Sequence, residues 1–238
     1  MIKTAIANPK YGEIMPENTP KVKPILFNCE MVQALLSGRK TQTRRALNLQ
    51  PNRIIRDDVF FFPDQSMMNG TKRTSLHVYC PFGKSGDLLY VRETCRADEN
   101  EDSGVDYVEY LAGGKTKDIL PTEEAVGQWL DLHHYRNKYG AVVPSIHMPR
   151  WASRLTLRIL DVRVERVQDI THDNAEAEGI KKDTGKYRYA ASNFAALWDS
   201  INDQCGFGWD ANPWVWVVEF EVLHGNVDSF IIKPEKEL

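Results

Sequence analysis

Two long segments in which apolar and polar residues alternate place the strongest limit on how this chain can fold. Residues 155–167 alternate as a strand does, but the alternation changes phase near Leu160. This change predicts one long bent strand, or two strands joined by a bulge, as a small β-barrel requires. Residues 214–222 form the second segment, which we interpret as a half-buried closing strand. Together the two segments predict a mostly β fold.

Helical patterns lie between and beside these strands. Asn28, Thr122 and Thr171 are residue types that favour the position just before a helix. A later segment carries Phe194, Leu197, Trp198 and Ile201 at helical spacing, which we interpret as a packing surface. We expect helices over 28–37, 121–139, 171–178 and 190–201, and shorter strands over 23–27 and 88–91. The predicted fold class is α+β, a mostly β structure with flanking helices.

Composition narrows the functional classes. The 238-residue chain is 42% hydrophobic and 26% charged, which suits one large core or two small ones. Its net charge is −3 and its pI is about 6.1, so it lacks the basic balance of proteins that bind nucleic acid through many phosphate contacts. No segment reaches transmembrane length and the N-terminus lacks a signal-peptide core. We therefore expect a cytoplasmic protein with no membrane partner.

The cysteines and histidines do not have the spacing of a metal site. The four cysteines are scattered without a Cys-x-x-Cys pair, so we expect reduced, mostly buried thiols. The nearest candidates for metal ligands are the pair His133 and His134, and His77 near Cys80. We expect no metal ion and no cofactor.

The sequence Gly38-Arg39-Lys40-Thr41-Gln42-Thr43-Arg44-Arg45 is the strongest candidate for a functional site. Its glycine is suited to end the preceding helix in a left-handed conformation. In a strand after that helix, Thr41, Thr43 and Arg45 would share one face, with Lys40 at the entrance to that face.

The chemistry of this face has two interpretations. A Thr hydroxyl is a weak nucleophile unless a base accepts its proton, and a Lys can do so only if burial or a neighbouring cation lowers its pKa. Arg39, Arg44 and Arg45 crowd Lys40 with positive charge. Alternatively, the threonines are ordinary strand formers and the cations form a solvated edge. Spacing alone leaves both interpretations open.

This part of the chain resembles the ASCH-domain family, a branch of the PUA-like β-barrels. The helix followed by Gly38, Lys40 and Arg45 matches the family pattern Gly-x-Lys-x-x-Glu-x-Arg. Thr43 departs from this pattern, since many members carry Glu there. The small bacterial N4-acetylcytidine amidohydrolases of the family carry Thr at the same position. The resemblance therefore implies a PUA-like/ASCH small β-barrel with insertions and an amidohydrolase activity.

Three further stretches fit the family in the same order, namely residues 86–91, 170–180 and 215–220. In the amidohydrolases the working residues are a Lys, a Thr three residues later and a Glu near the end of a later helix. By position these fall on Lys40, Thr43 and Glu178, with Arg45 binding substrate or developing charge. A carboxylate in the last turn of a helix opposes the helix dipole at a cost of about 0.3–1 kcal/mol. A nearby Lys40 would give Glu178 a functional reason for this placement.

The whole chain also resembles longer ASCH proteins encoded by phages and prophages. We expect a single ASCH domain over residues 23–224, enlarged by an insertion at about 98–150. An irregular N-terminal lead-in, residues 1–22, and a polar C-terminal tail, residues 225–238, would flank it.

Residues 144–151, within the insertion, are expected to form a rigid loop because two prolines bracket its centre. We expect this loop to lie beside the site and to narrow it. Arg150 and Trp151 offer a guanidinium and an aromatic plane of the kind that holds a nucleobase, so we predict that both bind substrate. The alternative is that Trp151 fills a core and Arg150 is a charge at its rim.

The resemblance and the residues together predict an amidohydrolase that removes an acyl group from the exocyclic amine of N4-acylcytidine or a related nucleoside. Thr43 would attack the amide, Lys40 would transfer the proton, and Glu178 would hold Lys40. The alternatives are a non-catalytic module that binds RNA or a modified base, and an ASCH-type ribonuclease. The predicted partner is a nucleoside or modified-base substrate, with RNA as the alternative, while the acyl group and the oligomeric state stay open.

Overall fold

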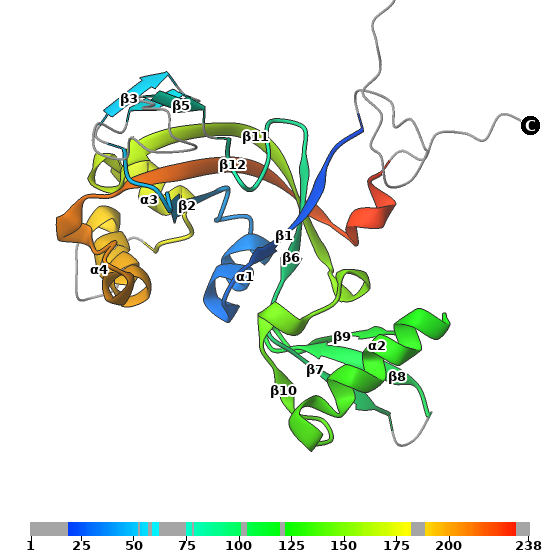
Figure 1. Ribbon diagram of the computed structural model, residues 1–238. Helices are drawn as coiled ribbons and strands as arrows, with labels where there is room; N and C mark the ends of the chain where they lie inside the picture. The colour runs from blue at the N-terminus through cyan, green and yellow to red at the C-terminus, as the bar shows by residue number, and fades with distance from the viewer. Residues whose placement is uncertain are drawn as a thin grey trace, which may run out of the picture.

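The computed structural model describes residues 19–51, 53–56, 59–61, 75–77, 79–100, 104–119, 122–181 and 189–231. Within these ranges the protein has a mixed α+β fold with a five-stranded, a four-stranded and a three-stranded sheet (Figure 1). This confirms, at a coarse level, the predicted combination of β structure with flanking helices. None of the helices in these ranges is long and apolar enough to span a membrane.

The five-stranded sheet carries the candidate site. Its strands are β1 (Val22–Leu26), β2 (Gln42–Ala46), β6 (Leu88–Arg92), β11 (Leu155–Arg166) and β12 (Trp214–His224). Their spatial order is β1-β6-β11-β12-β2; β1 and β6 are parallel, and all other neighbours are antiparallel. The two segments of alternating residues form β11 and β12, which pair with each other along the sheet.

β11 is irregular at the place where the sequence alternation changes phase. Its pairing with β12 shifts register between Ile159 and Asp161, and Leu160 between them is 53% exposed. An extra residue of this kind bends a strand and increases its twist. The predicted bulge is therefore confirmed.

The sheet is open in the described part of the chain, where we expected a closed small barrel. Its edge strands β1 and β2 do not pair with each other there. A side chain reaches across instead, because Arg45 Nη2 on β2 donates to the carbonyl oxygen of Leu26 on β1 at 2.9 Å. A guanidinium therefore joins the two edges in place of a ladder of backbone hydrogen bonds.

The first part of β12, residues 215–218, is buried on both faces, whereas we predicted a strand half-buried throughout. On one face Val218 and Phe220 belong to the main core, and on the other Val215 and Val217 belong to a second cluster. That second cluster is closed by α3 (His172–Ala177) and α4 (Ala190–Asn202). Helices therefore cover this face of β12 along Val215 and Val217, whereas Glu221 farther along the strand is exposed.

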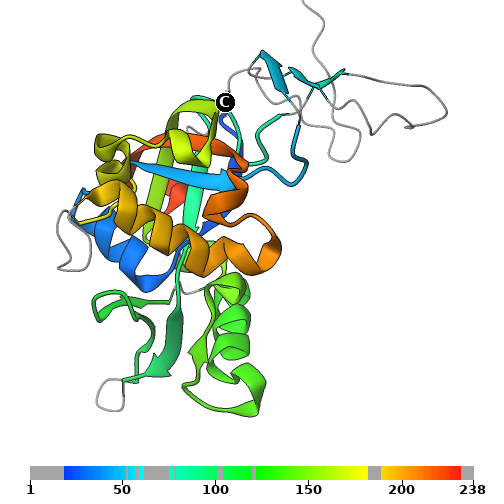
Figure 2. The same ribbon diagram turned by 90° about the vertical axis from the view of Figure 1, so that its left-hand side faces the viewer.

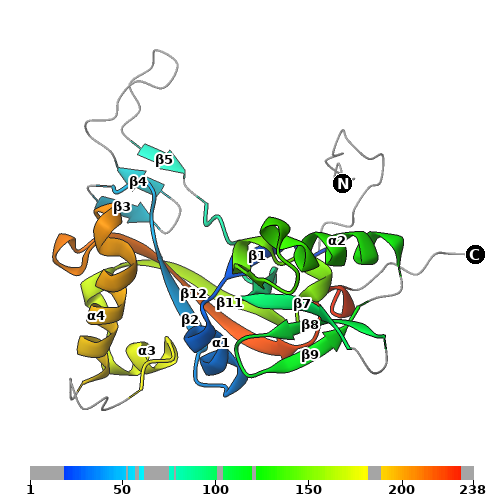
Figure 3. The same cartoon turned by 90° about the horizontal axis from the view of Figure 1, so that it is seen from below.

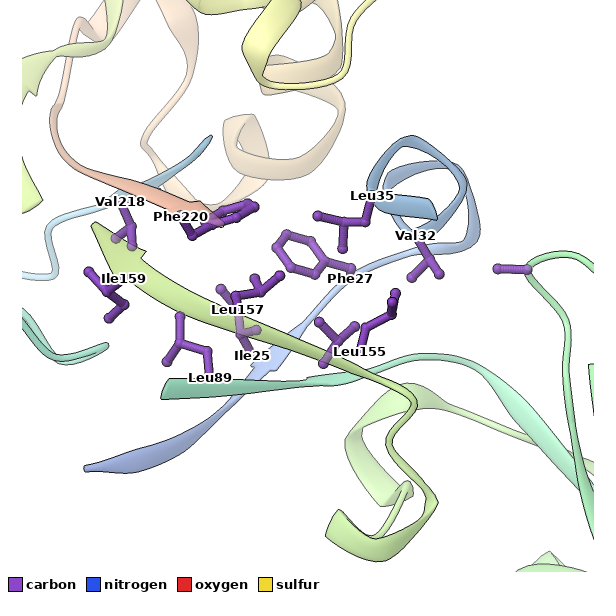
Figure 4. Close-up of a cluster of buried hydrophobic side chains, with 12 residues drawn as sticks. Ile25, Phe27, Val32, Leu35, Leu89, Leu155, Leu157, Ile159, Val218 and Phe220 are labelled. Carbon is purple, nitrogen blue, oxygen red and sulfur yellow. The ribbon is translucent and has the colours of Figure 1, made fainter. Parts of the chain in front are cut away.

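The main core lies under α1 (Cys29–Leu36), on the opposite side of β12 from α4. Figure 4 shows Phe27 between Leu35 of the helix and Leu157 of the sheet. The helix begins where predicted, because the Asn28 side chain accepts a hydrogen bond from the N–H of Met31 at 2.8 Å. This start places the end of α1 directly before β2.

Residues 95–152 form an inserted unit with its own sheet and core (Figure 3). Its elements are β7 (Cys95–Glu99), β8 (Asp106–Tyr110), β9 (Lys115–Asp118), α2 (Glu123–His133) and β10 (Val142–Val143). The sheet order is β10-β7-β8-β9. α2 begins at the predicted cap Thr122 but ends before the predicted residue 139, since Arg136 has a left-handed φ of 55° that no α-helix accommodates.

A third sheet, of order β3-β4-β5, is formed by β3 (Arg53–Arg56), β4 (Val59–Phe61) and β5 (Ser75–His77). Most of the predicted lead-in and part of the predicted tail, residues 1–18 and 232–238, lie outside the described residues.

Candidate functional site

Three side chains at the start of β2 point toward the segment that contains α3. They belong to Lys40, two positions before the strand, and to Gln42 and Arg44 within it. Gln42 Nε2 donates to the carbonyl oxygen of Asn174 at 2.7 Å. Lys40 Nζ and Arg44 Nη1 donate to the two carboxylate oxygens of Glu178 at 2.8 and 3.2 Å. These donors are two positions apart, so they share one face of the extended chain. The face that meets Glu178 is thus the opposite of the one we predicted as the site.

Lys40 and Glu178 form the buried ion pair at the centre of the site. Lys40 is 0% exposed and Glu178 is 7% exposed. Lys40 Nζ also donates to the backbone carbonyl oxygen of Glu178 at 2.9 Å, and the two backbones form an isolated antiparallel bridge. The predicted contact between these residues, which lie 138 positions apart, is confirmed.

The surroundings of the Lys40 amine lower its pKa below the ordinary 10.5. Burial is the largest cause and favours the neutral amine. The charge and hydrogen bond of Glu178 raise the pKa, whereas the charges of Arg45 and Arg44 lower it further. A larger fraction of Lys40 is therefore neutral at a given pH than in an exposed lysine, and a neutral amine can accept a proton.

Gly179 allows the elements around this pair to approach closely. Its φ is +92°, and a Cβ added there would lie 2.7 Å from the Cβ of Ala34 and 3.3 Å from that of Lys40. Ala34 belongs to α1, and its carbonyl oxygen accepts the N–H of Lys40 at 3.1 Å. The glycine thus holds the end of α1, the Lys40 backbone and the segment after α3 together.

Gly179→Ala should lower the free energy of unfolding by about 1–3 kcal/mol, because it combines an unfavourable φ with a steric overlap. Urea denaturation measures the difference. Gly114→Ala is the matched control, since Gly114 also has a positive φ, +64°, but nothing lies within 4 Å of its added Cβ. An equal loss in both variants would show that the close approach to Ala34 is unimportant.

Thr43 is fully buried, and its hydroxyl has no hydrogen-bond partner in the described part of the structure. It pairs with Val218 of β12, so its side chain lies toward the main core and away from α3. Its hydroxyl is therefore not hydrogen-bonded to Lys40. A buried hydroxyl without a partner costs about 1–3 kcal/mol.

Phe27 marks the place where side chains from both faces of β2 converge. Its ring centre lies 5.5 Å from Lys40 Nζ and 5.3 Å from Cζ of Arg45. Cations are attracted to the face of an aromatic ring at such distances. The predicted residues Lys40 and Arg45 thus meet at Phe27, although they start from opposite faces of the strand.

A pocket of about 450 Å³ opens beside this cluster. Its charged lining residues are Arg44, Arg45 and Glu178, and its aromatic ones are Phe27, Phe194 and Trp198. α1 and α4 supply two of its walls, and Figure 2 shows both helices above the inserted unit. Lys40 and Thr43 are not among the lining residues, because both are completely buried behind that lining.

The structure places Arg150 and Trp151 outside the lining of this pocket, which therefore gives no support to their prediction as substrate-binding residues. Trp151 is 9% exposed and packs in the core of the inserted unit. Arg150 forms an ion pair with Asp228. The alternative interpretation of a core tryptophan and a rim charge describes both. The predicted loop does reach the pocket, but through Ser145.

Sequence reasoning missed several residues of this pocket. Arg44 was assigned only as a neighbouring charge, yet it contacts Glu178 directly. Its position two residues after Gln42 and four after Lys40 was the available signal. The apolar stripe of α4 was interpreted as packing alone, whereas Leu197 and Ile201 also line the pocket. Nothing in the sequence near Thr94 indicated its place there, and Ser145 was expected near the site only as part of the loop 144–151.

The described residues contain no group of three or more His, Cys, Asp or Glu side chains placed to hold a metal ion. All four cysteines are free thiols, and Cys205 is exposed, in contrast to the expected burial. Burial raises the pKa of the Cys95 thiol to about 12.

Comparison with known proteins adds little to this geometry. No family model matches the sequence, and no curated protein matches it. Among solved structures, protein EF3133 from Enterococcus faecalis V583, described by the family model DUF984, is 11% identical and has a TM-score of 0.36. The likeness covers 90% of this chain and 86% of that one. So distant a likeness leaves fold and function to be argued from the residues themselves.

Proposed function

We propose that this protein is an amidohydrolase of the ASCH type, with a PUA-like sheet, that removes the acyl group from N4-acylcytidine or a related nucleoside. The observation that carries the proposal is the buried pair of Lys40 and Glu178 beside the pocket. The lowered pKa of Lys40 suits a proton acceptor. The resemblance of Lys40, Thr43 and Glu178 to the working residues of N4-acetylcytidine amidohydrolases supports the same activity.

The pocket suits a ligand of nucleoside size. Its volume of about 450 Å³ falls in the range of about 300–1,000 Å³ that is typical of small-molecule sites. Phe194 and Trp198 offer apolar aromatic surface, and Arg44, Arg45 and Glu178 offer polar atoms. A flat base with a polar edge needs this combination of surfaces.

In the proposed first step, neutral Lys40 accepts the proton of Thr43 while the Thr43 Oγ forms a bond to the amide carbonyl carbon. Arg45 stabilises the negative charge that develops on the carbonyl oxygen. The carbon–nitrogen bond then breaks, and Lys40 returns the proton to the departing exocyclic nitrogen. The products are the free amine of cytidine and an acyl ester on Thr43. Glu178 holds the Lys40 amine throughout.

In the second step, water attacks the ester carbonyl and gives its proton to Lys40. The ester bond breaks, Lys40 reprotonates the Thr43 Oγ, and the carboxylic acid leaves. Both steps require the Thr43 Oγ to reach Lys40 and the pocket. Because the Thr43 side chain faces the main core and the face of a strand side chain is set by the backbone, the edge strand β2 must shift locally for this. The hydroxyl has no hydrogen-bond partner in the described residues, so the shift breaks no hydrogen bond of the hydroxyl itself.

A second candidate function is a module that binds a modified base without catalysis. The complete burial of Lys40 and Thr43 favours it, since Arg44, Arg45 and Glu178 line the pocket and the two buried residues do not. Binding would then rest on these three side chains and on the aromatic walls.

Incubation with N4-acetylcytidine and with a short RNA, each analysed by mass spectrometry, separates the candidate functions. The amidohydrolase converts the nucleoside to cytidine and acetate and leaves the RNA intact. A binding module leaves both intact, and calorimetry then detects the bound nucleoside. Cleavage of the RNA would favour a ribonuclease and overturn the proposal.

Ser145→Trp should weaken nucleoside binding about tenfold or more, because a large side chain would fill part of the pocket at a cost of about 1–3 kcal/mol. Calorimetric titration with cytidine measures the change. Ile146→Trp is the matched control, since Ile146 is next to Ser145 in the sequence but is 58% exposed and does not line the pocket. If both variants bind cytidine as tightly as the wild type, the ligand does not occupy this pocket.

A further inference from the structure

A chain of ion pairs leads from the Lys40–Glu178 pair to the protein surface. Arg44 bridges two carboxylates, because its Nη1 donates to Glu178 Oε1 at 3.2 Å and its Nη2 donates to Glu165 Oε2 at 2.9 Å. The other oxygen of Glu165 accepts a hydrogen bond from Arg163 Nε. The proposed mechanism uses the first pair and leaves the rest of this chain without a role.

The members of the chain become more exposed with distance from Lys40. The Arg44 side chain is 0% exposed, that of Glu165 is 22% exposed, and that of Arg163 is 27% exposed. Arg163 also pairs with Glu219 and with Asp161, whose side chains are 40% and 59% exposed. Glu165 and Arg163 both lie on β11 beyond its bulge. The second half of β11 therefore holds the charged side chains that connect Arg44 with the protein surface.

Arg44 can contact Glu178 through one guanidinium nitrogen or through two. A free guanidinium prefers to grip a carboxylate with two parallel hydrogen bonds. Here Glu165 occupies one end of the Arg44 guanidinium, so one nitrogen of Arg44 reaches Glu178 and the oxygen Oε2 of Glu178 is left for Lys40.

We propose that Glu165 is a positioning residue for the Lys40–Glu178 pair, which it maintains by dividing the Arg44 guanidinium between two carboxylates. The expected effect on the pH profile of hydrolysis rests on the proposed function, whereas the expected effect on the Lys40–Glu178 contact does not. Without the Glu165 charge, Arg44 turns both nitrogens toward Glu178 and competes with Lys40 for it.

The charges around Lys40 fix the direction of the effect. Lys40 faces Glu178 from the end of α3, Arg44 and Arg45 from β2, and the uncharged ring of Phe27. Loss of negative charge at Glu165, and a closer contact of Arg44 with Glu178, both weaken the attraction that keeps the proton on Lys40. Lys40 then loses its proton at lower pH.

The test is Glu165→Gln, which keeps the side-chain shape and removes its charge. The pKa of Lys40, followed by ¹⁵N NMR of its amine, should fall by roughly one pH unit. The rise of kcat/KM with pH, which reports neutral Lys40, should move to lower pH by the same amount. Glu165→Asp, which keeps the charge, should move both in the same direction by less, and it serves as the test if Glu165→Gln does not fold.

Glu221→Gln is the matched control. Glu221 on β12 pairs with Arg158 on β11, but both side chains are about half exposed, at 47% and 45%, and neither belongs to the chain of ion pairs. It should change neither the Lys40 pKa nor the pH profile. An unchanged Lys40 pKa in the Glu165 variants overturns the inference, even if hydrolysis is observed. A shifted Lys40 pKa in a protein without hydrolysis supports the positioning role and instead rejects the proposed function.

Discussion

Thr43→Val should abolish turnover of N4-acetylcytidine, with a loss in kcat of about 10³-fold or more, while raising the free energy of unfolding by about 1 kcal/mol. Valine has the shape of threonine but lacks the attacking oxygen. The hydroxyl that it removes is buried and has no hydrogen-bond partner in the described residues, so its removal relieves an unfavourable burial. Product analysis by mass spectrometry and urea denaturation measure the two effects.

Companion variants separate catalysis from folding. Thr43→Ser retains an oxygen and should keep part of the activity. Lys40→Ala should reduce kcat as much as Thr43→Val does. The double variant should have a kcat little lower than either single variant, because the effects of residues that act as one unit are not additive. Hydrolysis by Thr43→Val at the wild-type rate would exclude Thr43 as nucleophile. A water molecule activated by Glu178 would then be the better account.

Glu178→Ala should give the largest loss of stability among the variants considered, about 3–5 kcal/mol. The substitution leaves Lys40 without its carboxylate and Arg44 with one partner instead of two, both in buried positions. Breaking a buried ion pair by removing one member is costly, since the remaining charge stays in an environment without water. Urea denaturation at neutral pH measures the loss.

Two further variants test whether burial of the ion pair causes the loss of stability in Glu178→Ala. Glu178→Gln keeps the shape and one hydrogen-bonding oxygen, so it should cost less stability than Glu178→Ala while still slowing hydrolysis. Glu221→Ala removes a carboxylate from the exposed pair with Arg158 and should cost about 1 kcal/mol or less. If Glu178→Ala is as mild as Glu221→Ala, the Lys40–Glu178 pair contributes little to the folded state.

Local patterns predicted those parts of the fold that depend on neighbouring residues. The caps at Asn28, Thr122 and Thr171 all accept a backbone hydrogen bond at the start of a helix, because capping involves residues only three positions apart. The bulge in β11 appeared as a change of phase in the alternation near Leu160. The pairing of Lys40 with Glu178 lies far beyond local range and came from the family resemblance.

Features that depend on what packs against a strand could not be predicted in this way. Both faces of β2 carry polar residues, so alternation defined two faces but not which one meets α3. Alternation could not show that helices cover the first part of β12, because the packing of α4 on a strand depends on tertiary contacts. Trp151 was assigned to substrate because a tryptophan beside an arginine suits a base equally well, and only the core of the inserted unit decides between the two.

The most direct test of the central claim is a search for the acyl group on Thr43 during hydrolysis. The protein is mixed with N4-acetylcytidine with and without hydroxylamine, quenched with acid in the first turnover, and digested for mass spectrometry. Our account predicts a rapid release of cytidine equal to the amount of protein, an acetyl ester on the peptide that contains Thr43, and acetohydroxamate when hydroxylamine is present. Steady release of cytidine with unmodified Thr43, and with acetate as the sole acyl product despite hydroxylamine, would contradict it.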